Sequence, residues 1–177
     1  MKKLYKFESD KVSYWEAWEA NGAITIHWGE LGDRGETEIL RLERGQSAKQ
    51  LIEQEAKKYR AEDYRQLKEG EEVTLLVQYE LEGWGTAEDL HKRHAVENLL
   101  NEGLGWTGNG KCDGGDIGSG TMNVCSLVVN PYIASNTVIQ ELRKNNLLEA
   151  AVIAIERDDS FEVLYPENFE KEFAYWY

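Results

Sequence analysis

The chain has 177 residues, of which 41% are hydrophobic and 30% charged, a composition typical of a globular protein with a substantial core. No apolar run approaches the ~18 residues that cross a bilayer, and the basic start MKKLYKFESD lacks the apolar stretch of a secretory signal. We therefore expect a cytoplasmic protein without a membrane segment. The cysteines, Cys112 and Cys125, are too few for a disulfide framework or a four-ligand zinc site.

The net charge of −13 is unevenly distributed. Residues 1–67 carry 12 basic and 13 acidic side chains, whereas residues 68–177 carry 8 and 20. Carboxylates in this excess repel phosphate backbones and attract basic surfaces. We therefore expect a basic protein partner and do not expect nucleic acid as a ligand.

The first elements in chain order form a hairpin. YWEAWEA (14–20) and AITIHW (23–28) flank Asn21-Gly22, the strongest short signal for a two-residue hairpin turn. TEILRLE (37–43) follows as a third strand.

A helix is expected next. Ser47 and Gln50 have the spacing of a capping box, and an apolar stripe at near-helical spacing follows: Ala48, Leu51, Ile52, Ala56 and Tyr59. The polar stretch LKEGEE (67–72) predicts a boundary, so residues 1–67 form a small antiparallel sheet with one helix.

Residues 68–177 alternate between strands and helices. Strands are expected at 73–81, 121–129, 150–156 and 161–165, and helices at 87–102 and 131–146. Asn130-Pro131 suits an N-cap followed by proline at the first helical position. The pattern predicts a four-stranded sheet with two helices on one face, a ferredoxin-like α/β sandwich, and the whole chain belongs to the α+β class. A further strand inside the glycine-rich residues 103–120 would change the strand order.

AITIHWGELGDRGETE (23–38) resembles the signature of WGR domains, small modules known from poly(ADP-ribose) polymerases. The resemblance covers roughly residues 4–67 and depends on Trp28-Gly29, then Gly32 and Gly35, followed by the capped helix. In those polymerases the tryptophan and arginine contact a nucleic-acid end and neighbouring domains. The resemblance therefore implies contacts through Trp28, with His27 beside it.

Glu30 stands where the family has its arginine, and this replacement reverses the sign of the interaction with phosphate. Arg34, from the same turn, could supply a cation. The alternative for Trp28 is a core position between sheet and helix, which the flanking glycines would permit. Trp15 and Trp18 point to opposite faces of one strand, so we expect one of them to be exposed.

GLGWTGNGKCDGGDIGSG (103–120) holds eight of the 16 glycines and predicts a long binding loop. It nearly matches a phosphate loop, but Cys112 replaces the required hydroxyl, and the loop follows a helix instead of a strand. Asp113 and Asp116 could bind a cation, although the spacing of a calcium loop is absent. Trp106 is expected to be an anchor for a partner or to fill the core.

The remaining motifs indicate neither a metal site nor a catalytic site. His91 and His94 fall on the polar side of their helix, and no nucleophile motif is present. We expect no catalytic residue, no metal and no cofactor. Phe169, Phe173 and Trp176 have the spacing of a short C-terminal helix that caps the core or anchors a partner.

These features predict a noncatalytic, acidic protein-binding module, an inhibitor or immunity-type protein that docks on a basic partner. The candidate contact residues are Trp28, His27, Glu30, Arg34, Trp106, Asp113 and Asp116. Two alternatives remain open. One is WGR-like binding of a nucleic-acid end or of a partner related to ADP-ribosylation, and the other is an enzyme that uses residues 103–120.

Overall fold

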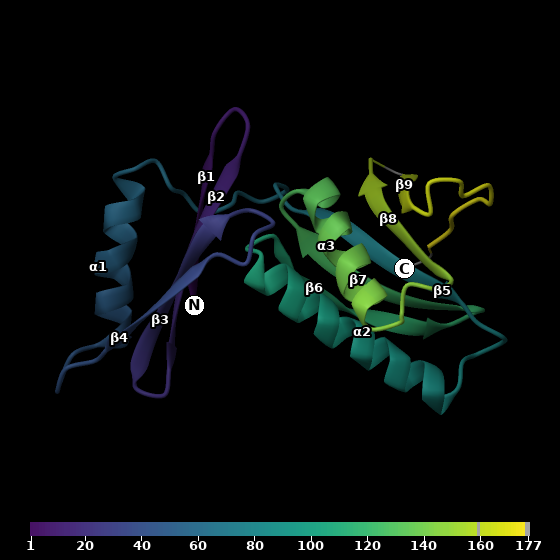
Figure 1. Ribbon diagram of the computed structural model, residues 1–177, viewed down its shortest axis with the longest axis horizontal. Helices are drawn as coiled ribbons and strands as arrows, with labels where there is room; N and C mark the ends of the chain where they lie inside the picture. Colours follow the sequence, from purple (N-terminus) through teal and green to yellow (C-terminus); the bar gives the residue numbers. More distant parts are fainter. Residues whose placement is uncertain (159, 176–177) are drawn as a thin grey trace. The chain divides into compact units, whose positions relative to one another are not determined.

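The structure is a computed structural model that describes residues 1–158 and 160–175. The chain divides into two compact units, each built on an antiparallel sheet (Figure 1). Unit 1 contains Met1–Glu69 and Trp106–Gly108, and unit 2 contains Gly70–Gly105 and Asn109–Tyr177. The protein belongs to the α+β class, as the sequence predicts.

Unit 1 is a meander of four strands with one helix. Its strands are β1 (Lys2–Phe7), β2 (Val12–Ala20), β3 (Ala23–Glu30) and β4 (Glu36–Arg41), in the order β1-β2-β3-β4, and α1 is Ala48–Arg60. The helix lies against one face of the sheet (Figure 1). The core between them contains Leu4, Trp15, Ala17, Ile24, Ile26, Ala48 and Ala56. The sequence patterns predicted three of these strands and missed β1.

The predicted hairpin is confirmed. Ala20 pairs with Ala23, and the two residues between them, Asn21 and Gly22, have φ of 53° and 73°. Asparagine and glycine tolerate this left-handed backbone better than other residues, which places the turn at this point.

The predicted capping box at α1 is wrong. Ser47 occupies the N-cap position, but its side chain makes no capping hydrogen bond. The side chain of Gln46 instead accepts a bond from the backbone N–H of Glu43 at 3.0 Å, within the preceding turn. α1 is therefore held mainly by the packing of its apolar face.

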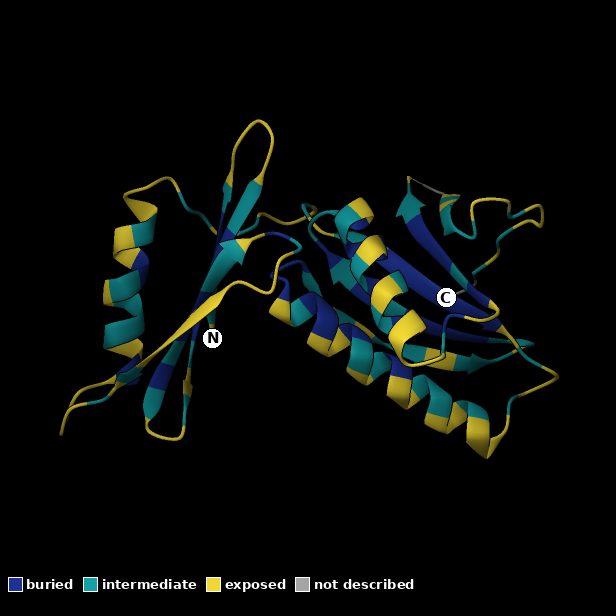
Figure 2. Ribbon diagram, viewed as in Figure 1, coloured by how far each residue is buried: buried dark blue, intermediate teal, exposed yellow. Residues whose placement is uncertain are grey.

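Unit 2 is a five-stranded sheet with two helices on one face (Figure 1). Its elements are β5 (Val73–Glu80), α2 (Ala87–Trp106), β6 (Gly110–Gly118), β7 (Thr121–Val128), α3 (Pro131–Lys144), β8 (Ala151–Arg157) and β9 (Ser160–Tyr165). The strand order is β6-β7-β5-β8-β9, and all neighbours are antiparallel. The central strands β7, β5 and β8 are largely buried, whereas the residues of the edge strands β6 and β9 are intermediate or exposed (Figure 2).

The helices of unit 2 share one core with the sheet. α2 contributes Val96, Leu100 and Leu104, and α3 contributes Ala134, Val138 and Leu142. The predicted cap of α3 is present, since the Asn130 side chain accepts from the N–H groups of Tyr132 and Ile133 at 3.1 Å. Pro131 follows at the first helical position.

The expected loop at 103–120 and the four-stranded sheet are both wrong. α2 continues to Trp106, and Gly110–Gly118 forms β6 at the edge of the sheet. Gly115 shows why glycine is required here, because a Cβ at this position would lie 2.3 Å from the carbonyl oxygen of Asn123. Close pairing of two backbones accounts for this glycine. The ferredoxin-like assignment stays a prediction.

The last described residues of the segment that follows β9 lie against the second face of this sheet. The segment is not helical within residues 166–175, so the predicted C-terminal helix is wrong there, and Trp176 lies outside the described residues. Gln78 on β5 donates to the Ala174 carbonyl at 3.0 Å, and the rings of Phe161 and Phe173 are 5.3 Å apart. Among the described residues, no helix is both long and apolar enough to cross a membrane.

Candidate functional sites

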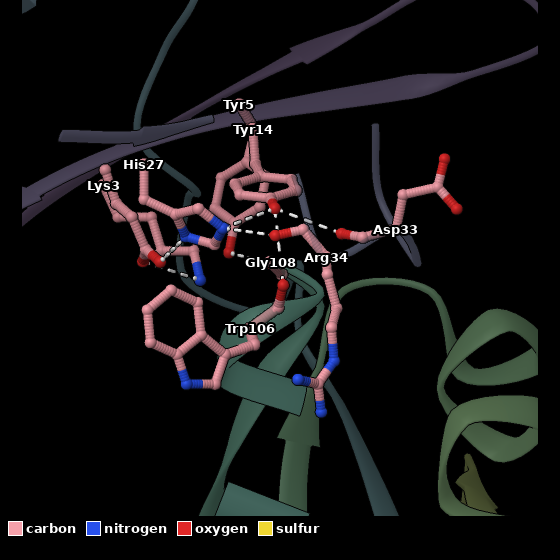
Figure 3. Close-up of polar contacts among 9 residues, drawn as sticks. Lys3, Tyr5, Tyr14, His27, Asp33, Arg34, Trp106 and Gly108 are labelled. Atoms are coloured by element: carbon pink, nitrogen blue, oxygen red, sulfur yellow. Dashed lines mark hydrogen bonds and ion pairs between the residues drawn. The ribbon is translucent and has the colours of Figure 1, made fainter. Parts of the chain in front are cut away.

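The face of the unit 1 sheet opposite α1 carries a polar network centred on His27 (Figure 3). His27 is fully buried, with its Nδ1 2.8 Å from Glu16 Oε1 and its Nε2 2.7 Å from the Arg34 carbonyl oxygen. The Glu16 carboxylate and the Arg34 carbonyl are both acceptor groups, so the imidazole ring lies between two acceptors. The ring thus joins β2 to the turn between β3 and β4.

Tyr14 and Lys3 complete the network. The Tyr14 hydroxyl lies 2.9 Å from His27 Nε2 and donates to the Asp33 carbonyl at 3.1 Å, and Lys3 Nζ lies 3.1 Å from Glu16 Oε2. Burial raises the pKa of the Tyr14 hydroxyl, and the negative charges of Glu16 and Asp33 raise it further. Tyr14 is therefore a neutral donor.

Residues 106–108 pack on this network. The Trp106 ring meets His27 edge to face at a centroid distance of 5.0 Å, and it meets Trp18 at 6.4 Å. The Thr107 carbonyl accepts from Gly32 N–H at 2.9 Å, and the Gly108 carbonyl accepts from the Tyr5 hydroxyl at 3.0 Å. Side chains and backbone groups around His27 thus enclose its ring and hold the turn that follows the Trp-Gly dipeptide of β3.

The predicted contact residues of unit 1 do not form one surface. Trp28 packs, partly buried, against the core on the α1 side, whereas His27 faces the other side of β3. Glu30 and Arg34 are exposed, and the backbone carbonyl oxygen of Arg34 contacts His27 Nε2 in the network. Trp18 is half-buried under Trp106, so neither Trp15 nor Trp18 is the exposed indole that the sequence predicted.

In unit 2, the predicted residues Asp113 and Asp116 are exposed on β6. Asp116 Oδ1 accepts from the side-chain amide of Asn123 at 2.8 Å, and Asp116 Oδ2 accepts from the Tyr175 hydroxyl at 3.3 Å. Asn123 in turn accepts from Gln78 at 2.8 Å. These groups form a polar row across β5, β7 and β6 on the face away from the helices.

The row borders a pocket of about 630 Å³. Described residues of the β6–β7 hairpin and of the C-terminal segment line it: Asp116, Ile117, Gly118, Ser119, Thr121, Asn123, Ala174 and Tyr175. Within this set, Asp116 alone carries a formal charge. The formal charge of the described lining is therefore negative.

Trp84, next to this pocket, is a candidate that the sequence patterns missed. Its side chain is 81% exposed, in a segment between β5 and α2 that pairs with the β6–β7 turn through Leu81 N–H to Gly120 O and Gly120 N–H to Gly83 O. A Cβ at Gly118 would lie 3.8 Å from Trp84 Cε3, so the indole lies beside the pocket rim. The signal in the sequence is a tryptophan between two glycines in the acidic stretch EGWGTAED.

No cluster of three or more histidine, cysteine or acidic side chains among the described residues could hold a metal ion. His91 and His94 are exposed on α2. Burial raises the pKa of both thiols, Cys112 and Cys125, which keeps them protonated and weakly reactive.

Comparison with known proteins finds no matching protein-family model, no matching curated protein and no matching solved structure. The resemblance to WGR domains therefore stays a prediction.

Proposed function

We propose that the protein is a noncatalytic binding module of the cytoplasm that docks on a basic partner protein, as an inhibitor or immunity-type protein does. The observation that carries this proposal is Trp84, an indole 81% exposed in the acidic part of the chain. Tryptophan is enriched among the residues that contribute most of the binding energy at protein interfaces.

The charges around Trp84 support the same partner class. Glu82 and Glu88 flank it in the sequence and are exposed, and residues 68–177 carry 20 acidic and 8 basic side chains. Carboxylates around an aromatic anchor accelerate association with a basic surface and disfavour acidic partners.

The alternatives have less support. WGR-like binding of a nucleic-acid end or of a partner related to ADP-ribosylation would use Trp28, His27 and Arg34, but His27 is buried and Trp28 packs on the core. An enzyme that uses residues 103–120 as a glycine-rich loop has less support, because these residues end α2 and form β6.

The test is affinity capture with the full chain as bait, using the wild type, Trp84→Ala and Phe7→Ala. Phe7 is a matched control, since it is an aromatic residue of unit 1 that is 43% exposed. We expect the wild type and Phe7→Ala to retain the same basic protein, and Trp84→Ala to lose it by at least about tenfold, as at an interface hot spot.

Salt dependence and a gel shift complete the test. The association rate of the captured protein should fall between 50 and 200 mM salt, about the range over which screening sets in. A gel shift with short duplexes at low salt should show no binding. Binding of a duplex, or capture of an acidic protein insensitive to Trp84→Ala, would overturn the proposal.

A further inference from the structure

We propose that the pocket between the β6–β7 hairpin and the C-terminal segment binds a guanidinium group, the side chain of an arginine on the partner protein. This inference rests on the proposed function and names the chemistry of the contact. The charge of the pocket, the held geometry of Asp116 and the position of Trp84 together select this group.

Asp116 offers a carboxylate whose position is already set. Asn123 holds one oxygen at 2.8 Å and Tyr175 the other at 3.3 Å, and Asn123 is itself 3% exposed and held by Gln78. A carboxylate has about four lone-pair positions, so each oxygen keeps one for an incoming donor. Two parallel N–H donors at fixed spacing are what a guanidinium supplies.

The groups around Asp116 favour a cation that can also form hydrogen bonds with uncharged groups. Ser119 and Thr121 add hydroxyl groups to the lining, and no basic side chain is among the described lining residues. Lys171, in the C-terminal segment, is paired with Glu80. At about 630 Å³, the pocket has room for an arginine side chain with bridging water.

The position of Trp84 favours arginine over lysine as the bound side chain. The indole lies beside Gly118 at the pocket rim, where a planar cation bound to Asp116 can stack on its face. A lysine ammonium has neither the planar surface nor the fork that matches a carboxylate. We therefore expect a preference for arginine.

The test uses the isotopically labelled full chain and three acetylated, amidated tripeptides, Gly-Arg-Gly, Gly-Lys-Gly and Gly-citrulline-Gly, followed by NMR. Citrulline has nearly the shape of arginine without its charge. We expect the arginine peptide to shift the Trp84 indole and Asn123 side-chain amide signals and the citrulline peptide to leave them unchanged. The lysine peptide should bind several times more weakly than the arginine peptide.

Two isosteric variants locate the contact. Asp116→Asn should weaken arginine binding at least about tenfold, as expected for loss of a bidentate charge-assisted pair. Asp113→Asn removes the same charge from the same strand, outside the pocket lining, and should leave binding within about twofold of the wild type. The unchanged amide spectrum of each variant reports that the fold is intact.

Equal responses to arginine and citrulline would overturn the inference, as would equal losses from the two variants, since diffuse attraction then accounts for binding. These results are independent of the capture experiment. If a basic protein is captured through Trp84 but the peptides do not bind at Asp116, the pocket assignment fails and the proposed function stands. If the peptides bind and no basic partner is captured, the site stands and the function fails.

Discussion

His27 and Trp28 are neighbours in the chain, and β3 turns their side chains to opposite faces of one sheet. His27 is fully buried among Glu16, Tyr14 and Trp106, whereas Trp28 packs against the core under α1. The alternation along β3 predicts that the two side chains diverge. It does not predict that both faces are covered, because Trp106 reaches this sheet from far along the sequence.

Gly108 is required by the packing of Tyr14. Its φ is +67°, and a Cβ would lie 2.2 Å from Tyr14 Cδ1. We predict that Gly108→Ala destabilises unit 1 by about 2–4 kcal/mol, from the left-handed backbone and from overpacking together. Urea unfolding followed by tryptophan fluorescence measures this loss.

Gly45→Ala is the matched control for this prediction. Gly45 also has a positive φ, +83°, but nothing lies within 4 Å of its Cβ position. Gly45→Ala should therefore lower the free energy of unfolding only by the backbone contribution, about 1 kcal/mol. Equal losses from the two variants would show that the contact with Tyr14 contributes nothing.

At the scale of elements, β6 shows the limit of sequence patterns. Its sequence GKCDGGDIG holds four glycines, which leave little alternation of apolar and polar side chains to read. The strand forms because its backbone pairs closely with that of β7. Gly115 shows this, since a Cβ at this position would clash with the carbonyl oxygen of Asn123. A glycine-rich stretch thus predicts unusual backbone, and its partner decides between loop and strand.

The two predicted helix caps differ in the structure, and this difference can be measured. Asn130 accepts two backbone bonds at the start of α3, while Ser47 accepts none at the start of α1. We predict that Asn130→Ala costs about 1 kcal/mol of unfolding free energy and that Ser47→Ala costs less than about 0.5 kcal/mol. Thermal and urea unfolding of the two variants would check this prediction. An equal cost would mean that Ser47 caps α1 in solution.

At the scale of the whole molecule, the net charge of −13 bears on stability. Like charges repel more in the compact chain than in the unfolded chain, and salt screens this repulsion. We predict that raising NaCl from about 20 to 200 mM increases Tm by about 2–4 °C, equivalent to roughly 1 kcal/mol for a chain of this size.

A charge-reduced variant provides the control. Glu72→Gln, Glu149→Gln and Glu170→Gln together remove three exposed carboxylates from unit 2. This variant should have a higher Tm than the wild type at low salt and a smaller response to added salt. A fall of Tm with salt would show that ion pairs such as Arg93–Glu97 outweigh the repulsion.

Local chemistry made part of the structure predictable from the sequence. The Asn21-Gly22 hairpin and the Asn130 cap each depend on a few consecutive residues with a strong backbone preference, and both are present. The α+β class and the excess of carboxylates in residues 68–177 also follow from the sequence alone. These properties need no knowledge of which distant segments meet.

The tertiary structure alone decided the environment of each candidate residue. It buries His27 beneath Trp106, assigns Gly110–Gly118 to β6, places residues 173–175 against the sheet of unit 2 and leaves Trp84 exposed. The physical reason is that burial depends on what covers a surface, and Trp106 and Ala174 reach the residues they cover from tens of residues away in the sequence. A periodic pattern describes one element and contains no information about that distant partner.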